Sequence, residues 1–229
     1  MNKNFIISPS IMCSTPADME PYAHAFEASG IDAIHFDVMD GHYVPNIMLG
    51  VRDYAALKKA TKLPIDLHLM CTDPEGFVQI LQPAEGDWVS FHPETARNPH
   101  RLLMDLKARG CKTGIALSPG VPVSYIAELG TYLDFVLVMA VNPGFAGQKM
   151  LPDHLDKLHR VREETARFDH KIDIIVDGNT TVPNSINMLK NGATGLVIGT
   201  SSAMKYGAAR FCEEYERYIL DIMRGWNEQ

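Results

Sequence analysis

The chain has 229 residues, of which 46% are hydrophobic and 21% charged, a composition typical of a soluble globular protein. Its formal net charge of -7 at pH 7 argues against a nucleic-acid-binding surface. The four cysteines form no CxxC motif, and no apolar run is long enough to cross a membrane, so we expect a cytoplasmic protein with neither nucleic acid nor membrane as a partner.

Strand-like and helix-like segments alternate along the whole chain. The expected strands are Phe5–Ser8, Ala33–Val38, Ile65–Leu69, Trp88–His92, Lys112–Leu117, Phe135–Ala140, Ile172–Val176 and Gly195–Ile198. The expected helices are Ala17–Ser29, Val51–Ala60, Pro74–Gln82, Pro99–Arg109, Ser124–Leu129, Pro152–Phe168, Val182–Asn191 and Ala208–Met223. Several strands are almost continuously apolar, which favours a parallel sheet covered on its outer face.

This alternation predicts one domain over residues 1–229, an α/β fold of the single (β/α)8 TIM barrel type. Asp73-Pro74 and Asn98-Pro99 each place a capping residue before a proline suited to the first helical position. A doubly wound open sheet is the alternative. It is disfavoured because polar residues follow strands spread along the whole chain, which converge at one mouth only in a barrel.

Polar side chains alternate with apolar ones on two of the expected strands. His35 and Asp37 share one strand face, and Asp66 and His68 repeat the pattern on the next strand. A later strand ends on Asp177. Two imidazoles and two carboxylates delivered from strand ends favour a divalent metal site. The alternative is that each histidine is a hydrogen-bonded core residue and each aspartate a helix cap.

Three glycine-containing loops follow the sixth, seventh and eighth strands. They are Val141–Gln148, Asp177–Asn179 and Gly199–Ser202, and together they predict a phosphate-binding cup at the barrel mouth. The segments Gly41–Gly50 and Gly144–Met150 are expected to act as lids over this mouth.

Other polar residues give weaker signals. The segment His92–Thr95 is expected at the rim of the barrel. The remaining histidines are expected to be solvated because no partner pattern surrounds them: His24, His100, His154, His159 and His170.

Five sequence blocks resemble the ribulose-phosphate 3-epimerase family in order and spacing: Ser8-Pro9-Ser10, His35–Asn46, Asp66–Met70, Val141–Gln148 and Asp177-Gly178. The resemblance covers nearly the whole chain. It implies a (β/α)8 barrel, one divalent metal ion (zinc, manganese, iron or cobalt, with magnesium possible), a homo-oligomer and a ketose phosphate substrate.

The resemblance also implies roles for individual residues. The metal ligands would be His35, Asp37, His68 and Asp177, with Asp37 and Asp177 as the catalytic acid/base pair. Substrate would contact Ser10, His68, Met39, Met70, Met139, Gly144, Ala146, Gly147, Gly178, Asn179, Gly199 and Thr200.

The resemblance leaves the substrate open. Ala146, Asn179 and Thr200 depart from the pattern of the pentose-phosphate enzymes. The segments Ser10–Cys13, His92–Thr95 and Ile198–Ser201 look more like the D-allulose-6-phosphate 3-epimerase branch. We therefore expect C3 epimerisation between D-allulose 6-phosphate and D-fructose 6-phosphate. The alternative pair is D-ribulose 5-phosphate and D-xylulose 5-phosphate.

Two other functions compete with an epimerase. A decarboxylase or aldolase on a similar barrel would carry a lysine where this chain has His68. A non-catalytic sugar-phosphate sensor would have no need for both Asp37 and Asp177.

Overall fold

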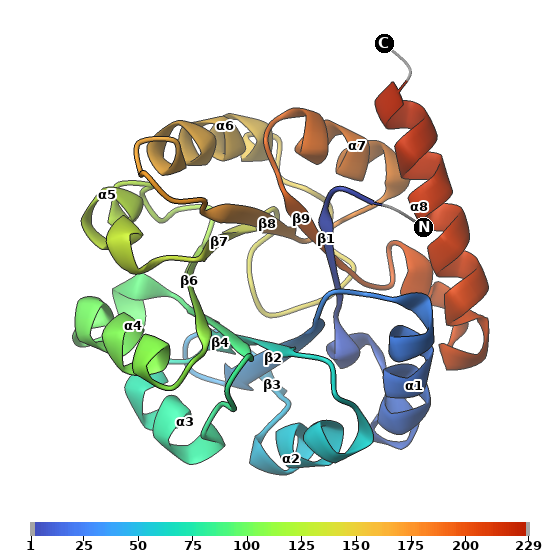
Figure 1. The fold of residues 1–229 in the computed structure, drawn as a ribbon, viewed down its shortest axis with the longest axis horizontal. Helices are drawn as coiled ribbons and strands as arrows, with labels where there is room; N and C mark the ends of the chain where they lie inside the picture. The colour runs from blue at the N-terminus through green and yellow to red at the C-terminus, as the bar shows by residue number, and fades with distance from the viewer. Residues whose placement is uncertain (1–2, 228–229) are drawn as a thin grey trace.

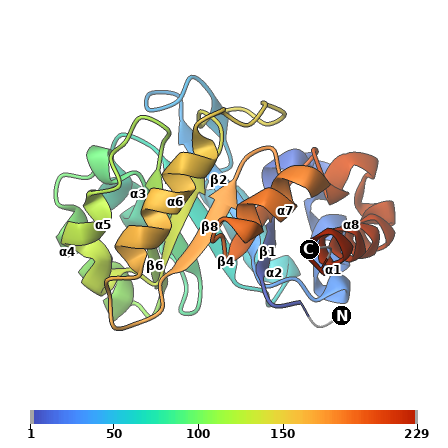
Figure 2. The same ribbon diagram turned by 90° about the horizontal axis from the view of Figure 1, so that it is seen from above.

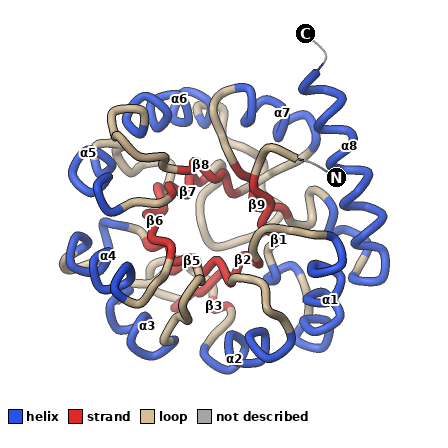
Figure 3. The backbone as a smooth tube through the Cα atoms, in the orientation of Figure 1, coloured by secondary structure: helices blue, strands red, loops and turns tan. Residues whose placement is uncertain are grey.

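The computed structural model describes residues 3–227, which form a ring of strands inside a ring of helices (Figures 1 and 3). The strands are β1 (Ile6–Pro9), β2 (Ile34–Asp40), β3 (Ile47–Met48), β4 (Ile65–Met70), β5 (Trp88–Phe91), β6 (Lys112–Leu117), β7 (Phe135–Met139), β8 (Asp173–Asp177) and β9 (Gly195–Ile198). Their order in the sheet is β1-β9-β8-β7-β6-β5-β4-β2-β3. All neighbouring strands pair in parallel except the short β3, which is antiparallel to β2.

The barrel closes between β1 and β2. A parallel bridge between Ser10 and His35 joins the end of β1 to β2. The prediction of a (β/α)8 barrel is therefore confirmed, with eight parallel strands and the additional hairpin strand β3 in the described residues.

Eight α-helices surround the strands in the described part of the chain. They are α1 (Met19–Ser29), α2 (Val51–Ala60), α3 (Pro74–Leu81), α4 (Pro99–Ala108), α5 (Tyr125–Leu129), α6 (His154–Thr165), α7 (Val182–Lys190) and α8 (Phe211–Asn227). The Asp73 and Asn98 side chains cap α3 and α4, as their positions before prolines predict. None of the helices described here is long and apolar enough to cross a membrane.

Strand alternation divides the apolar side chains into two cores. The inward-facing apolar side chains fill the end of the barrel opposite its mouth: Trp88, Ala116, Phe135, Leu137 and Ile175. The outward-facing strand residues pack under the helices in a larger continuous core. Because this end of the barrel is filled with apolar side chains, the polar side chains at the carboxyl ends of the strands are supported by a rigid, packed base.

Two loops project from the same end of the barrel, the end at which the parallel strands finish (Figure 2). The first follows β2 and contains β3, and the second joins β7 to α6. The side chain of Asn46 in the first donates a hydrogen bond to the carbonyl of Gly144 in the second at 2.8 Å. The two expected lids therefore touch one another in this structure.

Candidate metal centre and phosphate pocket

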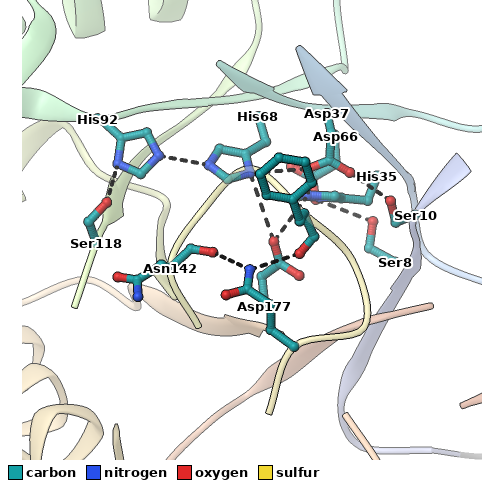
Figure 4. A network of polar contacts seen from close by, with 12 residues as sticks. Ser8, Ser10, His35, Asp37, Asp66, His68, His92, Ser118, Asn142 and Asp177 are labelled. Carbon is teal, nitrogen blue, oxygen red and sulfur yellow. Dashed lines mark hydrogen bonds and ion pairs between the residues drawn. The ribbon is translucent and has the colours of Figure 1, made fainter. Parts of the chain in front are cut away.

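Four polar side chains from three strands meet at the mouth of the barrel (Figure 4). His35 and Asp37 alternate along β2, His68 lies on β4, and Asp177 is the last residue of β8. The register places Asp37 beside His68 in neighbouring strands. One ligand atom from each residue lies within 4.8 Å of the others.

The spacing of these atoms suits a divalent cation. Nε2 of His35 lies 3.2 Å from Asp37 Oδ1 and 3.8 Å from Asp177 Oδ2, and Nδ1 of His68 lies 3.4 Å and 3.9 Å from the same oxygens. Metal–ligand bonds of roughly 2.0–2.2 Å would require donor separations of this order. Neither of these imidazole nitrogens has a hydrogen-bond partner among residues 3–227, although both are buried. The cluster therefore fits a metal ion.

Hydrogen bonds from surrounding residues orient the cluster. Asp66 is fully buried, and its Oδ2 lies 2.7 Å from Nδ1 of His35 and accepts from Ser8 at 3.2 Å. This contact leaves Nε2 of His35 facing the cluster, which is the usual arrangement of a carboxylate behind a metal-binding histidine. Ser10 Oγ donates to Asp37 Oδ2 at 2.6 Å. Asp66, predicted only as a member of a polar strand face, thus lies behind the cluster.

The two carboxyl groups of the cluster have different proton affinities. Burial opposes ionisation of Asp37, yet the neighbouring His35 and His68 imidazoles hold its pKa well below the usual range. Burial raises the pKa of Asp177 to about 6, and the nearby Asp37 charge also raises it. Two carboxyl groups with their pKa values pushed apart are a common arrangement for an acid/base pair.

A pocket beside the cluster is bordered by the glycine-containing loops. Its wall includes ten of the twelve predicted substrate residues: Ser10, Met39, Met139, Gly144, Ala146, Gly147, Gly178, Asn179, Gly199 and Thr200. Asp37 and Asp177 of the cluster line it as well. The other two, His68 and Met70, do not line this pocket: His68 belongs to the metal cluster, and Met70 packs against Met39 and Val44.

Backbone conformation explains two residues of the cup. Gly178 has φ +114°, and a Cβ there would lie 2.7 Å from Val141 Cγ2. Asn179 adopts a left-handed φ of 51°, which asparagine tolerates better than most residues. Its side-chain oxygen accepts from the Met150 amide at 3.2 Å and from Asn184 at 2.8 Å. Asn179 therefore maintains the turn after β8 and anchors Met150, at the end of the second expected lid.

Two expectations about histidines are wrong. His92 was expected at the rim, but it is fully buried, with Nε2 3.0 Å from Nε2 of His68. His154 was expected to be solvated, but it is 3% exposed, and neither ring nitrogen has a hydrogen-bond partner in the described part of the chain. Both errors have the same cause, which is that no local sequence pattern indicates burial at these positions. His92 is an inward polar residue near a strand end, and His154 lies in the first turn of a helix that packs on the barrel. The other four lie at exposed positions: His24, His100, His159 and His170.

Comparison with known proteins adds independent information. Residues 6–203 match the model of the ribulose-phosphate 3 epimerase family. A ribulose-phosphate 3-epimerase from Escherichia coli K12 is 36% identical over 223 residues, covering 97% of this chain and 96% of the relative. The ribulose-phosphate 3-epimerase from Eremothecium gossypii is 38% identical over 207 residues, covering 86% and 85% of the two chains.

Solved structures of lower identity share the fold. A mutant tryptophan synthase alpha-subunit from Pyrococcus furiosus aligns with a TM-score of 0.65 at 14% identity, over 98% of this chain and 100% of that one. A thiamine phosphate pyrophosphorylase from Pyrococcus furiosus aligns with a TM-score of 0.61 at 15% identity, over 98% of both chains. At these identities the likeness concerns the barrel alone.

Proposed function

Because the chain belongs to the ribulose-phosphate 3-epimerase family and is a ketose-phosphate 3-epimerase, we propose that it interconverts D-ribulose 5-phosphate and D-xylulose 5-phosphate. The names of its relatives, at 36–38% identity over most of the chain, support this pair. They do not support the preference for D-allulose 6-phosphate expected from the sequence. Ala146, Asn179 and Thr200, which depart from the pattern of the pentose-phosphate enzymes, lie on the pocket wall.

We further propose that His35, Asp37, His68 and Asp177 hold one divalent metal ion. The observation that carries this proposal is the pair of buried imidazole nitrogens that face the two carboxylates and have no hydrogen-bond partner within the described residues. When bound, the ion would act as a Lewis acid and stabilise the negative charge that develops on the substrate as the C3 proton leaves.

The proposed proton transfers use the two carboxyl groups. Inversion at C3 requires one group to remove the proton from one face and another to return a proton to the opposite face. Asp37, whose pKa is low, would start as the base, and Asp177, whose pKa is raised to about 6, would start as the acid. The roles exchange for the reverse reaction. Ser10 would hold Asp37 in place through its 2.6 Å hydrogen bond.

The proposed phosphate site lies in the pocket formed by the loops after β7, β8 and β9. Small residues border it there, including Gly147 and Gly178, and such residues allow an anion to approach backbone amides. Met39 and Met139 would form an apolar wall between the phosphate and the cluster.

Side-by-side turnover assays test the proposed substrate. Purified metal-loaded protein is given D-ribulose 5-phosphate and D-allulose 6-phosphate, and kcat/KM is compared. We expect a value at least tenfold higher for the five-carbon sugar because misplacing the reacting carbon by about 1 Å can reduce the rate roughly a hundredfold. A higher value for D-allulose 6-phosphate would restore the preference expected from the sequence.

A further inference from the structure

A chain of hydrogen bonds leads from the metal cluster to a carboxylate outside it. Nε2 of His68 lies 3.0 Å from Nε2 of His92, and Nδ1 of His92 lies 3.1 Å from Oγ of Ser118 (Figure 4). Ser118 Oγ lies 2.8 Å from the Tyr43 hydroxyl, which donates to Glu94 at 2.7 Å. None of the four residues beyond His68 contributes a ligand atom to the cluster.

The carboxylate fixes the direction of every hydrogen bond in this chain. A carboxylate accepts only, so the single proton of the Tyr43 hydroxyl is directed to Glu94. Ser118 must then donate to Tyr43 and accept from Nδ1 of His92. A neutral imidazole has one N–H group, so Nε2 of His92 accepts from Nε2 of His68. Nδ1 of His68 is therefore left with a free lone pair, facing Asp37 and Asp177.

We infer that His92, Ser118, Tyr43 and Glu94 are positioning residues that select the tautomer of His68 able to bind a metal through Nδ1. This inference rests on the metal role proposed above for His68. Its analogue on the other side of the cluster is Asp66, which acts on His35 by one direct hydrogen bond. In the described residues no carboxylate contacts Nε2 of His68 directly, and His68 is connected to the Glu94 carboxylate through three intervening side chains.

The surroundings keep this chain in place. His92 is fully buried, and the Tyr43 ring packs against it at a tilt of 36°, with ring centroids 4.6 Å apart. The buried Lys157 ammonium donates hydrogen bonds to the carbonyls of Ser118, Pro119 and Val121, which fixes the loop that carries the Ser118 hydroxyl. Removing one hydroxyl should therefore interrupt the chain without displacing its neighbours.

The chain also connects the first lid to the cluster. Tyr43 belongs to the Gly41–Gly50 segment, so its hydroxyl completes the hydrogen-bond chain only when this loop lies against the barrel mouth. Metal affinity should consequently depend on a loop that supplies no ligand.

Zinc affinity of single-hydroxyl variants tests the inference. Zn²⁺ is titrated into metal-free protein in competition with a chelator. We expect Ser118→Ala and Tyr43→Phe to bind Zn²⁺ about 10–100-fold more weakly than the wild type, as is typical for loss of groups that orient ligands. Ser118→Thr keeps the hydroxyl and should restore affinity. Ser185→Ala, which breaks a buried 2.7 Å Ser–Tyr hydrogen bond outside the cluster, should bind like the wild type.

NMR of protein labelled with ¹⁵N-histidine provides a second measurement that a general loss of stability would not change. We expect His92 to carry its proton on Nδ1 in the wild type and to become a mixture of tautomers in Ser118→Ala. A proton on Nε2 of His92 in the wild type would overturn the inference, as would equal zinc affinity of the wild type and both hydroxyl variants. A wild type that binds no Zn²⁺ would instead refute the proposed metal role, and the inference with it.

Discussion

Asp37 and Asp177 show how one residue type acquires two properties from its surroundings. Asp37 is flanked by His35, His68 and the Ser10 hydroxyl, all of which favour its ionised form. Asp177 faces the negative charge of Asp37, and its carboxyl group is more basic as a result of burial and this repulsion. The sequence pattern predicts that both are present at the mouth but cannot predict which is protonated.

Asp177→Asn tests the acid/base role directly. The amide can neither donate nor accept the proton transferred at C3, so we expect turnover to fall by at least about a hundredfold with the fold retained. Epimerisation and exchange of the C3 proton with deuterium oxide are measured on metal-loaded protein. Asp173→Asn, at the other end of β8, should keep normal activity. Residual turnover above a few per cent in the Asp177 variant would contradict the assignment.

His154 makes stability depend on pH at a site away from the cluster. Burial lowers the pKa of this side chain from 6.5 to about 4. Below pH 6.5 the unfolded chain therefore takes up a proton that the folded protein does not, so the free energy of unfolding falls as the pH decreases.

We expect His154 to lower the free energy of unfolding by about 2 kcal/mol when the pH falls from 7 to 5. Urea unfolding of His154→Leu at both pH values should lack this part of the decrease, and the exposed His159→Leu on the same helix should behave like the wild type. The same pH dependence in His154→Leu and the wild type would show that another group is responsible.

At the scale of elements, hydrophobic periodicity and capping residues predict the barrel well. The expected bounds of Lys112–Leu117, Gly195–Ile198 and Val51–Ala60 agree with β6, β9 and α2 residue for residue. The strand β3 was not predicted because two residues within a loop carry no periodicity. The hydrogen-bond chain through His92 could not be predicted either. It joins side chains of a lid, of two strand ends and of the short 3-10 helix Pro93–Thr95, which come together only in the folded protein.

The two lids should respond to a bound phosphate as a pair. The Asn46 side chain links them by its hydrogen bond to Gly144, and the Asn179 side chain holds Met150 at the end of the second lid. We expect inorganic phosphate to slow amide hydrogen exchange in both Gly41–Gly50 and Gly144–Met150.

In Asn46→Ala the slowing should persist in the second lid and be lost in the first, because the link between them is gone. Asn191→Ala removes a side-chain bond to a carbonyl of the same 2.8 Å length at the end of α7 and should leave both responses intact. Exchange in the lids that does not change with phosphate in the wild type would count against a lid role.

At the scale of the whole molecule, the candidate metal centre lies beside the two neighbouring strands with the least backbone pairing in the barrel, β1 and β2. β1 and β2 are joined by one bridge, whereas every other neighbouring pair in the barrel shares at least three registered residues. The ligand atoms of the cluster come from β2, β4 and β8. The Ser10 side chain, at the end of β1, donates a hydrogen bond to Asp37 on β2 and so joins the two strands at this closure. A bound ion would therefore connect strands on both sides of the closure.

Metal removal should consequently lower the stability of the entire barrel. Without a cation, buried carboxylates face one another, and any ion that binds only the folded state stabilises it by mass action. At a free zinc concentration about a thousandfold above the dissociation constant, we expect the free energy of unfolding to exceed that of EDTA-treated protein by about 4 kcal/mol. In His68→Ala, which lacks one of the four ligands, the unfolding midpoint in urea should be almost insensitive to EDTA. A wild-type midpoint that is the same with Zn²⁺ and with EDTA would show that the cluster holds no ion that contributes to the fold.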